Sequence, residues 1–319
     1  RDQRHQVENN ASSLLRALSM SYTEKYGMHE GSFPPTSEIL GIMARRLEEH
    51  FDQEHGGLTG APKFPMPSIW NFLLAAHHHK PSAKLAHHLQ LTLDKMGKGG
   101  IYDHLGGGFA RYSVDEGWFA PHFEKMLYDN AQLISLYAQA YQVFSTPLYK
   151  KIVYDTVQFL ERELLSAEGG FYTALDADSE GEEGKYYTWT AKDVRAIAGP
   201  HADLFCDFFD VQEAGNWEQG LNILQQQVSL GDLAAKYNLA PEAVKDHIET
   251  VKSKLMETRA KRVRPGLDDK ILAGWNAMTI CGLVDAYHAF GDEKFLDLAL
   301  QNADFLTENL IVEDRIFRN

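Results

Sequence analysis

The sequence contains little cysteine. Cys206 and Cys281 are the two cysteines in 319 residues, and they are far apart and in no Cys-x-x-Cys pair. This spacing argues against a redox couple or a zinc site and predicts two buried thiols. A disulfide framework is not expected, which favours a reducing compartment, and we predict a cytoplasmic location. We expect neither a cofactor nor a resident metal ion.

Long apolar runs and an excess of positive charge are also missing. No run approaches the roughly 18 apolar residues of a membrane span, and no signal peptide follows the first residue, Arg1. The formal net charge of −14 repels nucleic acid backbones and anionic membrane surfaces. We therefore expect neither nucleic acid nor a membrane as a partner. A neutral or cationic small molecule fits this charge better.

What the sequence does contain is a succession of apolar stripes at the spacing of an α-helix. The predicted helices cover about 36–51, 67–79, 83–97, 133–144, 153–164, 190–198, 241–259, 280–287 and 295–306. Glycine-rich loops separate them, and a small hairpin is expected between residues 171–174 and 185–190. This order predicts an all-α fold of helical hairpins with small β-hairpins in the loops.

Helical hairpins of this kind can be buried by closing them into an (α/α)6 toroid of inner and outer helices, whose loops line a central funnel. Six hairpins close such a ring, and the sequence shows about four, so we expect an incomplete ring unless residues 200–240 supply more helix. An irregular helical bundle is the alternative, because the loops are unevenly spaced.

The loop sequences 99–115 and 121–129 combine glycines, aromatic residues, two histidines, an arginine and several carboxylates. Buried charges are costly unless they are paired, so this mixture predicts a polar pocket. His104 is a candidate general acid or base that Asp103 orients. The equally weighted alternative is a loop clamp, in which Asp103 accepts hydrogen bonds from backbone N–H groups.

The second loop sequence offers His122 and Glu124 for proton transfer to a sugar-like substrate. Its alternative is a network of ion pairs that holds the inner helices, which we favour for Lys125 with its i, i+4 neighbour Asp129. Further polar and aromatic side chains near the same loops are predicted to bind the substrate. They are Arg111, Tyr112 and Tyr128.

Other candidates for this funnel lie further from these loops. Asp176 and Asp178 form an acidic pair that faces either the substrate or solvent, in a segment without the EF-hand calcium pattern. Asp269 is placed on the funnel wall, although acids here also suit a helix cap. Trp275 is predicted to stack on a sugar ring and Asn276 to bond its hydroxyl groups.

Lys63 follows a Gly-Gly loop and is expected either in the funnel or in a rigid surface turn. The histidine runs 77–79 and 87–88 are interpreted as solvated rather than as metal ligands, because adjacent histidines point in different directions.

Five longer motifs stand out along the chain, and they are Gly100–Phe109, Arg111–Asp115, Pro121–Asp129, Ala174–Glu180 and Asp268–Asn276. Together they resemble the spermatogenesis-associated, thioredoxin-related proteins of bacteria and animals. The resemblance implies an (α/α)6 barrel similar to N-acylglucosamine 2-epimerases and six-hairpin glycosidases, preceded by a thioredoxin-like domain. It implies that residues 1–33 are a linker or the last helix of that domain, and that 34–319 form a barrel without its final hairpins.

The resulting hypothesis is a carbohydrate-active barrel for a neutral sugar. In an epimerase, His104 or His122 abstracts and returns a proton beside a carbonyl with help from Glu124. In an inverting glycosidase, two carboxylates act as acid and base, with Asp103, Glu124, Asp176 and Asp269 as candidates. The rival hypothesis is a non-catalytic ligand-binding or protein-interaction module that works with a thioredoxin-like domain.

Overall fold

The computed structural model describes residues 37–313 and 315–319, and it divides the chain into two compact units after Arg46. The predictions made for residues 1–33 lie outside the described residues. Helix α3 (Ser37–Glu48) crosses the division between the units. The second unit is Leu47–Asn319.

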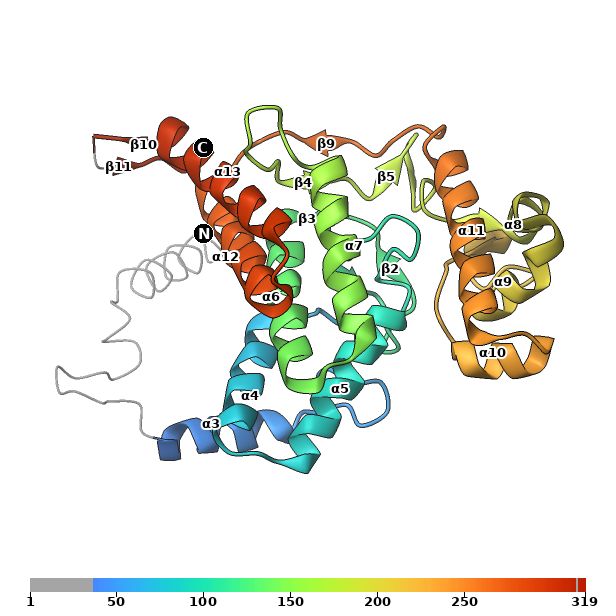
Figure 1. Ribbon diagram of the computed structural model, residues 1–319, viewed down its shortest axis with the longest axis horizontal. Helices are drawn as coiled ribbons and strands as arrows, with labels where there is room; N and C mark the ends of the chain where they lie inside the picture. The colour runs from blue at the N-terminus through green and yellow to red at the C-terminus, as the bar shows by residue number, and fades with distance from the viewer. Residues whose placement is uncertain (1–36, 314) are drawn as a thin grey trace, which may run out of the picture. The chain divides into compact units, whose positions relative to one another are not determined.

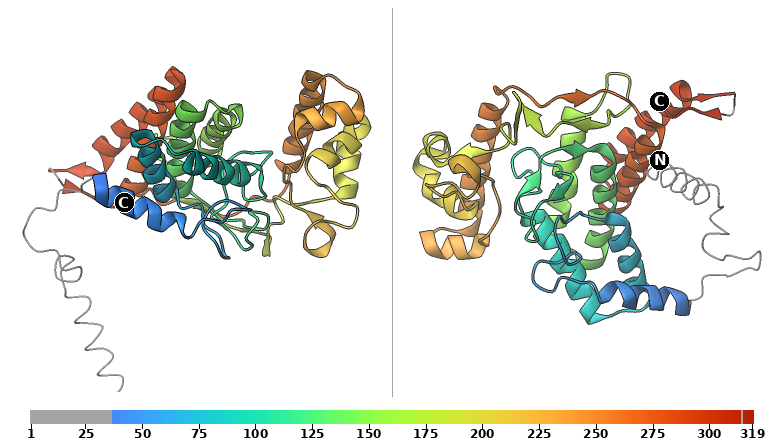
Figure 2. Two further views of the ribbon diagram at one scale, coloured as in Figure 1. Left: turned by 90° about the horizontal axis from the view of Figure 1, so that it is seen from below. Right: turned by 180° about the vertical axis from the view of Figure 1, so that it is seen from behind.

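Helical hairpins form the body of this unit (Figures 1 and 2). They are α4 (Pro67–His79) with α5 (Ala83–Lys98), α6 (Leu127–Phe144) with α7 (Pro147–Glu163), and α12 (Ala273–Phe290) with α13 (Glu293–Asn309). Helix α6 packs between α4 and α12, and α7 contacts α5 on its outer side. The second helix of each pair therefore covers the first, which is the inner and outer arrangement predicted for an (α/α) toroid.

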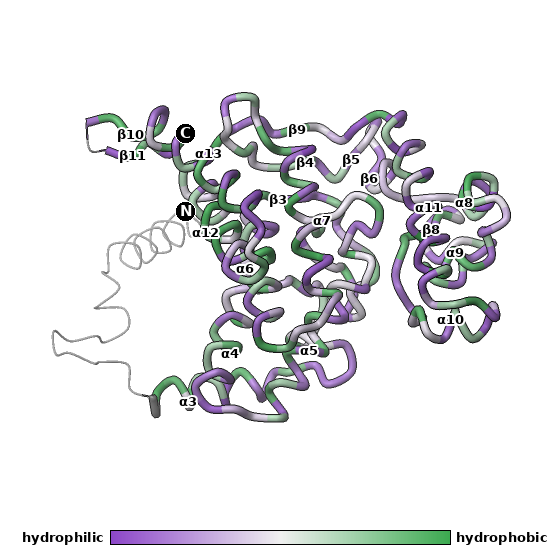
Figure 3. Tube along the Cα trace, in the orientation of Figure 1, coloured by the Kyte–Doolittle hydropathy of each residue, from purple (hydrophilic) through white to green (hydrophobic). Residues whose placement is uncertain are grey.

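The helix boundaries follow from local sequence signals. Pro147 begins α7 directly after Thr146, as its fixed backbone angle favours. Glycine at the left-handed position ends α12 at Gly291. Figure 3 shows hydrophobic and hydrophilic residues alternating along the helices, as expected for helices with one buried face. Within the described residues, no helix is long and apolar enough to cross a membrane.

Between α7 and α12 the chain builds a separate helical lobe (Figure 1). It consists of α8 (Ala191–Ala198), η1 (Gly199–His201), α9 (Ala202–Phe208), η2 (Glu218–Gly220), α10 (Leu230–Tyr237) and α11 (Pro241–Arg259). The lobe has its own core, in which Phe205, Leu233 and Val251 are buried. Residues 200–240 thus contain the additional helix that the apolar stripes did not reveal.

The loops contain short strands. Antiparallel pairs are β1 (Tyr112–Ser113) with β2 (Pro121–His122), β5 (Asp178–Ser179) with β6 (Glu182–Glu183), β7 (Trp189–Thr190) with β8 (Leu221–Asn222), and β10 (Ile311–Val312) with β11 (Arg315–Ile316). The predicted pairing of 171–174 with 185–190 is wrong, because Trp189 lies opposite Asn222 and the hairpin turns tightly at Glu180–Gly181.

A three-stranded sheet joins segments that are distant in sequence at the start of α6. It contains β3 (Lys125–Met126), β4 (Ala174–Leu175) and β9 (Leu267–Asp268), in that order. Met126 is paired with Ala174 and is also the residue that precedes helix α6. The sheet therefore fixes where α6 begins and where the charged side chains around it point.

The prediction of two buried thiols is half correct. Cys206 is buried in the core of the lobe, whereas Cys281 is exposed on α12. Helix α12 is apolar on most of its faces, so an apolar residue on it does not imply burial.

Replacing either of two glycines of α12 by alanine is expected to change stability, in opposite directions. A Cβ atom added at Gly282 would lie 2.5 Å from the carbonyl oxygen of Ala131, where α12 and α6 pack closely. We expect Gly282→Ala to lower the free energy of unfolding by roughly 1–3 kcal/mol, because the helices must separate. Gly274→Ala, in the same helix, meets nothing within 4 Å and is expected to raise it by up to about 1 kcal/mol. Urea unfolding of both variants tests this, and equal effects would contradict it.

Candidate functional site

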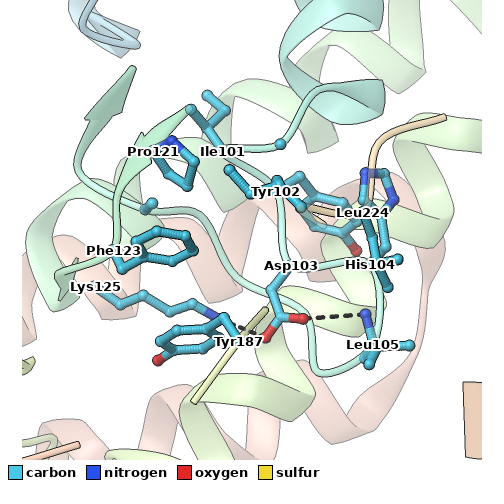
Figure 4. A pocket seen from close by; sticks show the side chains of 13 residues that line it. Ile101, Tyr102, Asp103, His104, Leu105, Pro121, Phe123, Lys125, Tyr187 and Leu224 are labelled. Carbon is cyan, nitrogen blue, oxygen red and sulfur yellow. Dashed lines mark hydrogen bonds and ion pairs between the residues drawn. The ribbon is translucent and has the colours of Figure 1, made fainter. Parts of the chain in front are cut away.

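A buried cluster of charges lies inside the glycine-rich stretch. The Asp103 carboxylate accepts hydrogen bonds from Lys125 Nζ and Arg259 Nη1, both at 2.8 Å. All three side chains are 8% exposed or less. Figure 4 shows Asp103 linked to Lys125 and to the backbone of Leu105. We call Asp103, Lys125 and Arg259 the buried cluster.

Electrostatics keep the buried cluster ionised. Desolvation alone would raise the pKa of Asp103, but the charges of Arg259 and Lys125 hold it well below its usual range. Asp103 also accepts the backbone N–H groups of Leu105 and Gly106. These are the contacts of the loop clamp, and they use the carboxylate entirely within the protein. The role predicted for Asp103 as a catalytic acid or base is therefore corrected to a structural one.

His104 also points into the interior rather than toward a ligand. Its Nε2 lies 3.0 Å from the carbonyl oxygen of Gly99, and the side chain is buried against Tyr102 and Phe209. Burial lowers the pKa of His104 to about 4, so the imidazole is neutral at pH 7. The adjoining cavity holds only about 30 Å³, which is room for a water molecule and not for a sugar. This geometry corrects the prediction that His104 is catalytic.

A second group of charges is partly exposed. Glu124 Oε2 lies 2.8 Å from Arg111 Nη1 and 3.7 Å from His122 Nε2. The other imidazole nitrogen of His122, Nδ1, lies 2.7 Å from Glu183 Oε1. These side chains are between 25% and 46% exposed, and the ring of Tyr112 stacks on His122. Strands β1 and β2, with the residues next to them, thus bring together Arg111, His122 and Glu124, as the sequence predicted. Strand β6 adds Glu183, which the sequence did not reveal as a candidate.

Helix α6 adds Tyr128 and Asp129 to the same group. Burial raises the pKa of Asp129 to about 7, against the lowering effects of the Arg111 charge and the Tyr128 hydroxyl. Its Oδ2 atom is buried and has no hydrogen-bond partner among the described residues. We call Arg111, His122, Glu124, Tyr128 and Asp129 the surface cluster.

Asp129 is not the ion-pair partner of Lys125 that the sequence predicted. Helical i, i+4 spacing does not apply to this pair, because Lys125 lies in β3 and α6 begins two residues later. Lys125 pairs with Asp103 instead. The available signal was the position of Asp129 in the first turn of a helix, among the polar residues of 121–129.

Trp275 and Asn276 differ although they are neighbours on α12. The Trp275 ring meets the Tyr128 ring edge-on at 4.8 Å and is half-buried beside the surface cluster. Asn276 is fully buried and bonds the backbone of Phe171 and Leu272 and the side chain of Asn302. No polar atom of Asn276 remains for a ligand, so its predicted role in binding a sugar is wrong.

The remaining candidates lie outside the surface cluster. Lys63 is buried and donates to Asp52 Oδ2 at 2.6 Å, which places it neither in a funnel nor in a surface turn. Asp176 and Asp178 are exposed, and Asp176 accepts the N–H of Ala177, as in the solvated-turn alternative. Asp269 is exposed and lies four residues before Ala273, the first residue of α12. The N-cap of α12 is Leu272, so Asp269 does not cap the helix.

The histidine runs are not uniformly solvated. His88 is buried, stacks on Phe51 at 3.7 Å and hydrogen-bonds with the carbonyl oxygen of Gly57, which corrects the solvated interpretation for this residue. His78, His79 and His87 are exposed. Across residues 37–313 and 315–319, no group of three or more His, Cys, Asp or Glu side chains is placed to hold a metal ion.

The surface cluster has the components for proton transfer. It combines an imidazole held between two carboxylates with a second carboxyl group whose pKa of about 7 populates both protonation states near neutral pH. Arg111 supplies a fixed positive charge, and Tyr112 and Trp275 flank the group with aromatic rings. Aromatic faces beside a few convergent polar groups suit a sugar ring.

Comparisons with known proteins come from sequence and from structure. No known family model matches the chain. Spermatogenesis-associated protein 20 of Homo sapiens is 33% identical over 99% of this chain and 45% of its own length. The protein of that name from Mus musculus is 37% identical over 83% of this chain and 37% of its own length. The chain thus spans less than half the length of these relatives.

A solved structure supports the fold. A glycoside hydrolase family 76 mannosidase from Bacteroides thetaiotaomicron aligns with a TM-score of 0.50 and 11% identity, over 92% of this chain and 56% of the other. At this identity the likeness concerns the fold, an (α/α)6 barrel of the six-hairpin type, as predicted from the sequence. On the strength of its sequence relatives, the chain belongs to the spermatogenesis-associated protein 20 family.

Proposed function

We propose that the surface cluster is a carbohydrate-active site that moves a proton on a neutral sugar, in the manner of a sugar 2-epimerase. The observation that carries the proposal is the pairing of an imidazole, His122, with carboxylates on both nitrogens beside a protonatable carboxyl group, Asp129. Acid and base of this kind are what the abstraction of a proton beside a carbonyl requires.

In the proposed reaction, His122 removes the proton from the carbon next to the carbonyl of an open-chain sugar. The electron pair of that C–H bond moves toward the carbonyl oxygen, which takes the hydroxyl proton of Tyr128, and the buried Asp129 replaces that proton. Arg111 and Glu124 orient His122 and compensate the charge that it gains. The enediol then rotates so that its opposite face meets His122, the imidazolium returns its proton to the carbon, and the hydroxyl proton goes back to Asp129 through Tyr128, which completes the epimerisation.

A second candidate is a non-catalytic binding or interaction module that works with a thioredoxin-like domain. It draws support from the buried cluster, in which Asp103 is entirely engaged by Lys125 and Arg259. The two candidates differ in whether the surface cluster exchanges protons with a bound sugar.

Deuterium exchange distinguishes the two candidates. We expect the chain, incubated in D₂O with hexoses, N-acetylhexosamines and disaccharides, to introduce deuterium at carbon 2 of at least one sugar, as measured by NMR. His122→Gln is expected to slow that exchange by a factor of about 10²–10⁴, because it removes the base. Sugar binding, followed by the rise in melting temperature, is expected to persist in this variant.

Asp178→Asn is the matched control, because Asp178 is exposed and outside the surface cluster. It is expected to exchange deuterium at the rate of the unchanged chain. A chain that binds no sugar and exchanges no deuterium would overturn the proposal and favour the module.

A further inference from the structure

A large groove lies beside the surface cluster. Its volume is about 870 Å³, and its walls come from the β5–β6 hairpin, strands β7 and β8, η2 and residues 261–263. This volume is at the upper end of the range for ligand-binding clefts. Arg111, Glu124, Tyr128 and Asp129 do not line it, so it is a separate feature of the surface.

Two residues connect the groove to the surface cluster. Glu183 lines the groove and also holds His122 Nδ1 at 2.7 Å. Pro121 lines the groove and directly precedes His122 in β2. The groove therefore borders the imidazole to which we assign proton abstraction.

Carboxylates outnumber cations on the groove walls, and two of the three cations are engaged by the protein itself. Lys185 pairs with Glu182 at 2.8 Å and with Glu180 at 3.4 Å. Arg262 donates to three backbone carbonyl oxygens and lies over the ring of Trp189 at 3.7 Å. Lys185 and Arg262 are thus engaged, whereas Lys261 makes no ion pair among the described residues. An anionic ligand would meet an excess of carboxylates, which are Glu180, Glu182, Glu183, Asp193 and Glu218.

Aromatic side chains complete the walls. Trp217 and Tyr186 both line the groove, and Trp217 is held edge-on by Phe123 at 5.4 Å. A rigid aromatic ring among hydroxyl and carboxylate groups binds the apolar face of a sugar while its hydroxyl groups are hydrogen-bonded.

We infer that the groove binds a neutral oligosaccharide, whose terminal sugar reaches the surface cluster. The inference rests on the proposed function and specifies its substrate class: a chain of several sugar rings rather than a free monosaccharide. The volume of the groove, the carboxylates that disfavour an anion, its aromatic walls and its link to His122 through Glu183 all support an extended uncharged ligand.

Calorimetric titration with a hexose, its disaccharide and its tetrasaccharide tests this inference, in glucose-based and mannose-based series. We expect affinity to rise by at least about tenfold from the hexose to the tetrasaccharide in one series, as additional rings enter the groove. Glu218→Arg places a long side chain at the groove wall and is expected to cancel that gain. Trp217→Ala is a second variant that removes an aromatic wall.

Glu308→Arg is the matched control, because Glu308 is exposed near the end of α13 and does not line the groove. It is expected to keep the full gain with chain length. If the hexose binds and exchanges deuterium but longer chains bind no better, the groove inference is overturned and the proposed function stands. If no sugar of any length binds, both are overturned.

Discussion

Replacing Asp103 with alanine is expected to lower the free energy of unfolding by roughly 3–5 kcal/mol, because the change leaves two buried cations without their counter-charge. Lys125 and Arg259 are almost entirely buried, and each donates to this carboxylate at 2.8 Å. The N–H groups of Leu105 and Gly106 lose their acceptor as well. Urea unfolding at pH 7 measures the loss.

The pH dependence of stability provides a second measurement of the same contact. The pKa of Asp103 is lower in the folded protein than in the unfolded chain. Its contribution is therefore complete above the unfolded value of about 3.9 and is lost as the pH falls through the folded pKa. The difference in the free energy of unfolding between the unchanged chain and Asp103→Ala should shrink as the solution is acidified below that value.

Asp178→Ala serves as the control, since this exposed carboxylate should change stability by no more than about 0.5 kcal/mol. A loss of the same small size for Asp103→Ala would contradict the structural role and return Asp103 to the catalytic candidates.

The helices could be predicted because their signals are local. Apolar periodicity predicted helices at 67–79, 83–97 and 241–259, which agree with α4, α5 and α11 to within a residue. The strands could not, because each has only two residues and its partner is set by tertiary contacts. Met126, Ala174 and Asp268 meet in one sheet although they are separated by long stretches of helix.

The candidate site could be predicted only in part, because the direction of a side chain also depends on tertiary contacts. Sequence analysis identified the polar loops, and the structure brings Arg111, Tyr112, His122, Glu124 and Tyr128 together there, with Trp275 beside them. The direction of each side chain was not predictable. His104 and His122 occur in similar polar sequences, yet one bonds a backbone carbonyl in the interior and the other lies between two carboxylates.

Replacing Asp129 with asparagine is expected to stabilise the protein at high pH and to abolish its proposed chemistry. The pKa of Asp129 is about 7 in the folded protein, against an ordinary value of 3.8. A raised folded pKa means that stability is greatest below the unfolded value and is lost as the pH rises through about 7. A pKa difference of this size lowers the free energy of unfolding by up to roughly 4 kcal/mol above pH 7.

Asparagine has nearly the same shape and no charge, so it removes this cost without opening a cavity. We expect Asp129→Asn to have a higher free energy of unfolding than the unchanged chain at pH 8, and a similar one at pH 4. Urea unfolding at the two pH values measures the effect, with Asp178→Asn as the exposed control.

The same variant should lose deuterium exchange into a bound sugar, because an amide cannot donate the proton that the carbonyl oxygen needs. Gain of stability with loss of exchange is the pattern expected where a protein keeps an unfavourable group for its function. If Asp129→Asn is instead less stable than the unchanged chain at pH 8, the carboxylate is held ionised by Arg111. The acid of the proposed reaction would then have to be another residue.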